Sequence, residues 1–242
     1  MSADTTQVTE FWNNVFASDS SIERPAIDDP DLQNALRHFG DVQGKRLLDI
    51  GCGKGATSLF FAQHGAEVVS VDFSEVAIEN LKKFCRANNI PNIQPVLLRA
   101  QEIETIGPFD GVFGSLILHH IEPFNDFAAI LRRTIAPGGK GFFIENNASS
   151  KLMLWVRKHI VGRLWITRLS DGEEFPFEPA EVEMLRAHFD VDVEYPELLY
   201  FRLISAYLFR CRMMKPFEIL DNFFYRYPGF RRCSYRQYVK LS

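Results

Sequence analysis

Short apolar runs alternate with amphipathic segments between Arg46 and Glu145, and this alternation constrains the fold more than any other feature of the chain. Apolar side chains recur at helical spacing after Ser74, which can cap the helix that they predict. The apolar runs predict five strands, over Arg46–Ile50, Glu67–Val71, Ile93–Leu98, Asp110–Leu116 and Gly141–Glu145. Because helices separate these strands, right-handed crossovers should join them into a mostly parallel sheet with helices on both faces.

The chain after Glu145 predicts further helices and two more strands. Lys151–Arg168 has five bases, two tryptophans and no acid, which is typical of a basic amphipathic helix, and Glu178–Phe189 predicts another helix. Val191–Tyr195 and Ser234–Leu241 complete the set of strands, and one of them is expected to run antiparallel. The fold class is therefore α/β, a doubly wound sheet of seven strands within a single domain of 242 residues.

The net charge of the whole chain predicts neither a nucleic-acid partner nor binding to an anionic membrane. Lys and Arg total 27 against 31 Asp and Glu, which gives −4. The four cysteines lie far apart without metal-site spacing, so we expect no metal and a reducing, cytoplasmic location. The polar N-terminus predicts no signal peptide, and the longest apolar run, Leu198 to Phe209, is interrupted by Arg202 and too short to span a membrane.

A glycine loop follows the first predicted strand, where Leu47–Gly55 reads LLDIGCGKG. Gly51, Gly53 and Ala56 satisfy the dinucleotide pattern, but Asp49 would set a carboxylate beside a pyrophosphate. A cationic nucleoside without phosphates, such as S-adenosylmethionine, suits the loop better. Asp49 can pair with its ammonium, Asp72 at the end of the second strand can accept both ribose hydroxyls, and Phe73 offers a face to the adenine.

Four motifs in order make residues 40–147 resemble the class I, Rossmann-like S-adenosylmethionine-dependent methyltransferases, of the kind that includes the ubiquinone- and menaquinone-biosynthesis enzymes. The motifs lie at 47–55, 68–74, 109–121 (FDGVFGSLILHHI) and 136–145 (APGGKGFFIE). The resemblance implies seven strands with one antiparallel, and the cofactor across the carboxyl ends of the first strands. The expected cofactor contacts are Asp49, Gly51, Cys52, Gly53, Gly55, Asp72, Phe73, Ala100, Gln101 and Ser115.

One position departs from the family pattern. An acidic residue that receives the adenine amino group commonly follows the third strand, but Arg99 stands there in this chain. We therefore expect the adenine to be recognised by backbone groups of Ala100 and Gln101 or by the Gln101 side chain.

His119, His120 and Glu145 are the candidate catalytic residues. The histidines follow the fourth strand, where the family's loop reaches the transferring methyl, and either could remove a proton from the acceptor. The alternative, which we favour from sequence, is that one histidine shapes the loop and the other is partly buried. Glu145 ends the fifth strand and could orient the substrate, assist deprotonation or cap the next helix.

The flanks of residues 41–147, the expected cofactor-binding core, supply a predicted lid and cap. Phe11, Trp12 and Phe16 favour a helical lid within residues 1–40 that excludes water. Residues 148–242 are expected to form a helical cap, inserted after the fifth strand, and the final strands. Residues 198–242 contain nine bases, two acids and twelve aromatic residues, which suit a substrate cap, a lipid or membrane surface or, less well, nucleic acid.

The predicted function is methyl transfer from S-adenosylmethionine to a small apolar or aromatic molecule at oxygen. The alternatives are a lipid-like substrate at a membrane surface, a nucleic-acid substrate and a protein that binds the cofactor without catalysis. The acceptor and the oligomeric state do not follow from the sequence.

Overall fold

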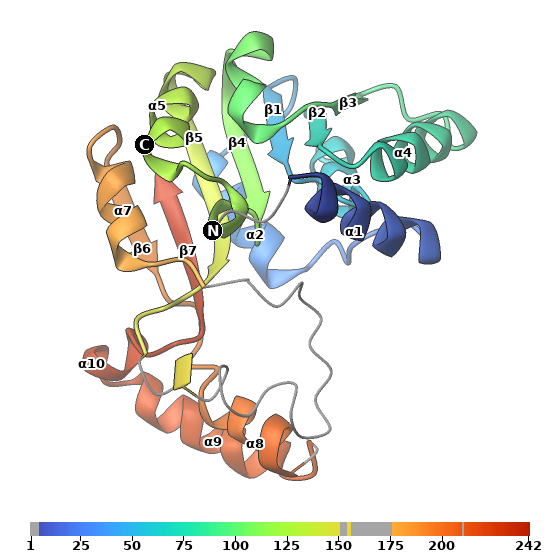
Figure 1. Ribbon diagram of the computed structural model, residues 1–242. Coiled ribbons are helices and arrows are strands. Elements are labelled where there is room, and N and C mark those ends of the chain that lie inside the picture. Colours follow the sequence, from blue (N-terminus) through green and yellow to red (C-terminus); the bar gives the residue numbers. More distant parts are fainter. Residues whose placement is uncertain (1–4, 151–153, 156–175, 210) are drawn as a thin grey trace.

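The computed structural model describes residues 5–150, 154–155, 176–209 and 211–242. Seven strands form one sheet in the order β3-β2-β1-β4-β5-β7-β6, in which β7 runs antiparallel to both of its neighbours (Figure 1). This confirms the predicted sheet. The strands are β1 (Arg46–Ile50), β2 (Glu67–Asp72), β3 (Ile93–Leu97), β4 (Phe109–Ser115), β5 (Ile135–Asn146), β6 (Val191–Glu194) and β7 (Arg236–Leu241).

Helices connect these strands. In chain order they are α1 (Thr5–Ser18), α2 (Pro30–Phe39), α3 (Ala56–Gln63), α4 (Glu75–Ala87), α5 (Phe124–Thr134), α7 (Pro179–Arg186), α8 (Phe201–Phe209), α9 (Met214–Tyr225) and α10 (Pro228–Arg231), with 3-10 turns η1 (Ala100–Ile106) and η2 (Leu118–His120). The Ser74 hydroxyl accepts a hydrogen bond from the Ala77 amide at 3.2 Å, so the predicted cap begins α4.

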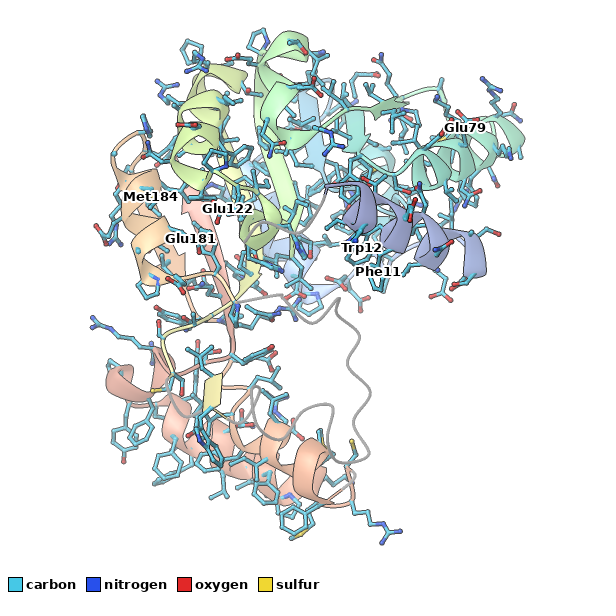
Figure 2. The ribbon with its side chains drawn as sticks, in the orientation of Figure 1. Phe11, Trp12, Glu79, Glu122, Glu181 and Met184 are labelled. Atoms are coloured by element: carbon cyan, nitrogen blue, oxygen red, sulfur yellow. The ribbon has the colours of Figure 1, made fainter. Side chains whose placement is uncertain are left out.

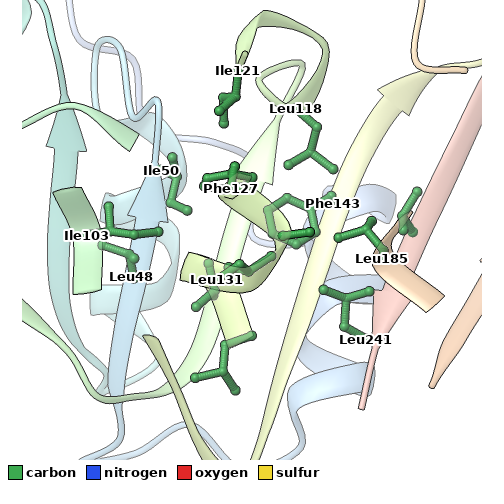
Figure 3. Close-up of a cluster of buried hydrophobic side chains, with 14 of the residues drawn as sticks. Leu48, Ile50, Ile103, Leu118, Ile121, Phe127, Leu131, Phe143, Leu185 and Leu241 are labelled. Atoms are coloured by element: carbon green, nitrogen blue, oxygen red, sulfur yellow. The ribbon is translucent and has the colours of Figure 1, made fainter. Parts of the chain in front are cut away.

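Two apolar cores lie on opposite faces of the sheet because successive side chains of each strand point to opposite sides. Leu48 of β1, Phe127 and Leu131 of α5 and Leu185 of α7 belong to one of these cores (Figure 3). The neighbouring Leu47 joins the other core, which α2, α3 and α4 cover. These cores fix the parallel strands and set their carboxyl ends along one edge.

The N-terminal segment divides into two parts. In α2, Leu32, Ala35 and Phe39 are buried in the second core, so this helix belongs to the sheet's covering layer. The aromatic helix α1 lies beside α4, in front of the carboxyl ends of β1 and β2 (Figure 1). Of the segment predicted as a lid, α1 is the helix at this edge, and its role as a lid stays a prediction.

The described helical lobe lies within residues 148–242, for which a helical cap and the final strands are predicted. Helices α8, α9 and α10 lie between β6 and β7. That they cover a substrate stays a prediction. They lie on the side toward which β1 and β4 point (Figure 1). The basic helix predicted over Lys151–Arg168 falls outside the described residues except at positions 154–155. Across the described ranges, every helix is too short or too polar to cross a membrane.

Candidate active site

The ends of four parallel strands bring the predicted site residues to one edge. Ile50 of β1 pairs with Val71 of β2 and with Gly114 of β4, and Ser115 of β4 pairs with Ile144 of β5. This register brings the glycine loop, Asp72, η2 and Glu145 to the same edge of the sheet. In open α/β sheets, ligands bind at this edge.

The glycine loop requires residues without a side chain. Gly51, Gly53 and Gly55 have φ values of 66°, 48° and 81°, in the left-handed region that glycine adopts without strain. A Cβ on Gly51 would lie 2.7 Å from the Ile117 side chain. The amides of Gly51 and Cys52 donate to the Val71 carbonyl at 2.8 and 3.0 Å, which ties the loop to β2. Cys52 is buried, and burial raises the pKa of its thiol well above the usual value.

Asp72 holds the glycine loop and faces the same edge. Its carboxylate oxygens accept hydrogen bonds from the amides of Gly53, at 2.9 Å, and Ser74, at 2.8 Å. The side chain is buried, and this burial raises its pKa despite the amide donors. Two carboxylate oxygens have about four acceptor positions between them, so Asp72 can still accept the hydroxyls of a ribose.

Asp49 lies behind the loop in a network of hydroxyl groups. Its Oδ2 accepts from Thr57 Oγ1 at 2.5 Å and from Ser58 Oγ at 2.6 Å, and Ser58 in turn accepts from Ser70. The pKa of Asp49 is raised to about 6, chiefly by complete burial, and the negative charge of Asp72 contributes to this rise. A nearby cation would favour the ionised forms of both carboxylates. The donors Thr57 and Ser58 were not predicted, although their place in the first turn after the loop was a usable signal.

Glu145 organises the loop that carries the two histidines. Its Oε1 accepts from the amides of Ile117, at 2.9 Å, and Leu118, at 2.7 Å, while Oε2 lies 2.7 Å from His119 Nδ1. The Glu145 side chain is completely buried and that of His119 is 6% exposed. The carboxylate therefore fixes both the backbone of η2 and the orientation of the His119 ring.

His120 faces the aromatic helix α1. Its ring centroid lies 4.1 Å from that of His119 and 6.2 Å from that of Trp12. Figure 2 shows Phe11 and Trp12 on the side of α1 that faces the site. The histidine pair thus connects the carboxyl end of β4 with α1.

Polar contacts also hold α1 over the glycine loop. The Ser74 hydroxyl donates to Asn13 Oδ1 at 2.6 Å, and Asn80 Nδ2 donates to the Phe16 carbonyl at 3.3 Å. A Cβ on Gly53 would lie 3.3 Å from the Phe16 ring. Asn13 could not be predicted, because its partner Ser74 is far away in the chain.

The remaining predicted residues lie around the same edge. Phe73 and Ser115 are half-buried at the ends of β2 and β4. Ala100 and Gln101 begin η1, and Gln101 Nε2 donates to the Glu122 carbonyl at 3.2 Å. That bond occupies one donor of the side chain considered for adenine recognition. In the part of the chain that the structure describes, no group of three or more His, Cys, Asp or Glu side chains could hold a metal ion.

Comparison with known proteins agrees with this geometry. A family model described as a methyltransferase domain matches residues 47–139. The ubiquinone biosynthesis O-methyltransferase of Bordetella avium is 31% identical over 135 residues, which are 54% of this chain and 53% of that enzyme. The chain thus spans about half the length of this curated relative.

Two solved structures share the fold over the whole chain. Geranyl diphosphate C-methyltransferase from Streptomyces coelicolor has a TM-score of 0.62 at 15% identity, covering 100% of this chain and 98% of that one. The cyclase SpnF has a TM-score of 0.61 at 15% identity, covering 100% and 96%. The family model, the curated relative and the sheet topology together support a class I, Rossmann-like S-adenosylmethionine-dependent methyltransferase.

Proposed function

We propose that this protein transfers a methyl group from S-adenosylmethionine to an oxygen atom of a small apolar or aromatic molecule. The observation that carries the proposal is the buried Glu145 carboxylate 2.7 Å from His119 Nδ1, beside a glycine loop that fits the cofactor. The O-methyltransferase name of the relative supports oxygen as the acceptor atom.

The residues present fit the cofactor in shape and in charge. The glycines at positive φ let the backbone approach its amino-acid tail, and Asp72 would accept the ribose hydroxyls. Asp49 would face the ammonium, directly or through water. Cys52, Phe73, Ala100, Gln101 and Ser115 would complete the contacts. The cofactor supplies a methyl group on a positively charged sulfur, and the two carboxylates suit that charge.

His119 is proposed as the general base. Since Glu145 faces Nδ1, the neutral ring carries its proton there, and Nε2 is the nitrogen that can take a proton from the acceptor hydroxyl. Positioned proton removal of this kind contributes about 10²–10⁴-fold to a rate. Glu145 is then a positioning residue rather than a catalytic one. His120 and Trp12 would border the acceptor, and α1 would exclude water.

Cofactor affinity is expected to fall below pH 6. Burial raises the pKa of Asp49 to about 6 in the free protein, whereas a bound ammonium favours its ionised form, so binding at lower pH must release a proton. The dissociation constant of S-adenosylhomocysteine, measured by calorimetry, should rise as the pH falls from 6 to 5. The steepest rise that one released proton can give is about tenfold per pH unit.

Asp49→Asn is the matched variant for this pH dependence, because it preserves the size of the side chain without a titrating proton. The variant should bind more weakly at pH 7 and lose most of the dependence. Any pH dependence of affinity that remains in this variant would come from Asp72, because burial raises the pKa of that side chain as well. A wild-type affinity that is constant from pH 7 to pH 5 would contradict the Asp49 contact.

A panel of acceptors tests the proposed function. The protein is incubated with S-adenosylmethionine and, separately, with phenols, carboxylic acids, primary amines and short RNA, and released S-adenosylhomocysteine is measured. We expect turnover with an oxygen acceptor of apolar or aromatic character. Turnover confined to amines or RNA would refute the acceptor class, and tight cofactor binding with no turnover of any acceptor would favour a non-methylating role.

A further inference from the structure

Helix α9 presents apolar side chains on two faces. Its inner face packs on α8: the Phe224 ring lies 5.3 Å from that of Phe201, and the buried Asp221 carboxylate accepts from Arg202 Nε at 3.0 Å. The Asp221 carboxylate also accepts hydrogen bonds from the backbone amides of residues 200–202, and these bonds fix the start of α8. The packing of α9 on α8 therefore explains the apolar residues on the inner face of α9 but not those on its other face.

The other face of α9 is apolar and exposed. Ile219 is 68% exposed and Phe223 is 49% exposed, one helical turn apart. The exposed side chains continue through Tyr227 to Phe230 in α10, with ring centroids 5.9 Å apart between Phe223 and Tyr227 and 6.4 Å apart between Tyr227 and Phe230. We call this surface the α9 outer face; it consists of Ile219, Leu220, Phe223, Tyr227 and Phe230. Contiguous exposed apolar surface of this kind marks an interaction site.

The α9 outer face is bordered by positive charge. Residues 209–232 contain six Lys and Arg against two acids, of which Asp221 is buried, while the chain as a whole has a net charge of −4. The exposed cations are Arg212, Lys215, Arg226, Arg231 and Arg232. Lys215, Glu218 and Asn222 of α9 and Arg226 directly after it form a polar stripe at helical spacing, which lies beside the apolar face. The charge is thus concentrated where the apolar surface is exposed.

We propose that the α9 outer face docks on a lipid bilayer that contains anionic headgroups. Aromatic and aliphatic side chains that flank one another enter the boundary between headgroups and acyl chains, while Arg and Lys at the rim reach the headgroup charges. Each such cation near an anionic surface contributes about 1 kcal/mol, equivalent to about fivefold in affinity. A second copy is the weaker occupant, because a two-fold interface through this face would bring the same cations together.

Vesicle flotation of the full chain tests the proposal independently of methyl transfer. Vesicles of phosphatidylcholine alone are compared with vesicles that also contain phosphatidylglycerol. We expect binding to the anionic vesicles that weakens with added salt, and much less binding to the neutral ones. The double variant Ile219→Ser/Phe223→Ser should lower the partition coefficient at least about tenfold. Replacing Arg212 and Arg226 with glutamine should lower it about fivefold for each charge.

The matched control is Ile27→Ser, because Ile27 is 67% exposed but lies before α2, far from α9 in the chain. This variant should bind vesicles like the wild type. Thermal melting checks that each variant is folded. Absence of wild-type binding to anionic vesicles would overturn the proposal, as would equal binding by the double variant. Concentration-dependent dimerisation that Ile219→Ser/Phe223→Ser abolishes, without vesicle binding, would assign the face to a second copy instead.

Discussion

Glu145→Gln is expected to lower turnover by about 10²–10⁴-fold while leaving cofactor affinity nearly unchanged. The glutamine carbonyl can still accept the amides of Ile117 and Leu118, so the η2 backbone should persist. Its amide group would donate to His119 Nδ1, which places the ring proton on Nε2. His119 would then be unable to accept a proton from the substrate. Steady-state kinetics with S-adenosylhomocysteine binding and thermal melting separate this tautomer effect from misfolding.

Two further variants serve as comparisons for Glu145→Gln, one that removes the carboxylate and one that alters a distant glutamate. Glu145→Ala leaves the two amides and His119 Nδ1 without their acceptor, so it should also lower the free energy of unfolding by about 3 kcal/mol. Glu104→Gln alters an exposed glutamate that pairs with Arg133 and should change neither property. Full turnover by Glu145→Gln would show that His119 is not the base and that Glu145 serves the loop alone.

Asp72→Ala is expected to weaken cofactor binding by about 1.5–3 kcal/mol, or about 10- to 150-fold, because hydrogen bonds to a charged group are lost. Asp72 also accepts the Gly53 and Ser74 amides, so part of the loss could arise from a displaced glycine loop. A cofactor analogue separates the two causes. S-adenosylhomocysteine without its 2′ and 3′ hydroxyls should bind the wild type more weakly than the parent compound, but should bind Asp72→Ala as well as the parent does.

The cycle of two proteins and two ligands therefore measures the ribose contact itself. Asp192→Ala provides the matched control, since Asp192 is an exposed carboxylate on β6, at the far side of the sheet. Additive losses from the Asp72 substitution and the missing hydroxyls would contradict the assignment of the ribose site.

The sheet and the glycine loop could be predicted because they depend on local pattern. Arg46–Ile50 is a strand with the predicted bounds, since a short apolar run that ends in glycines has few other solutions. The helices α8–α10 lie within residues 148–242, where a helical cap was predicted, but nothing local shows how such helices pack on one another and on the strands around them. The role of α2 was likewise missed, since its burial depends on β5, far along the chain.

The site could be predicted as a set of residues but not as a set of contacts. Asp49, Asp72 and Glu145 each lie at or next to the carboxyl end of a strand, and a parallel sheet brings strand ends together. That Glu145 bonds η2 depends on the register between β4 and β5, which sets Ser115 opposite Ile144. That α1 covers the loop depends on contacts such as Asn13–Ser74 and Asn80–Phe16 and on aromatic packing. Such contacts follow from tertiary packing rather than from spacing in the sequence.

The most direct test of the account is to follow a carbon-13 methyl group from S-adenosylmethionine to an acceptor by nuclear magnetic resonance, with wild-type protein and with His119→Ala. We expect an O-methyl signal that grows together with S-adenosylhomocysteine in the wild type and grows at least about a hundredfold more slowly in His119→Ala. Label on nitrogen or carbon, or equal rates in the two proteins, would contradict it.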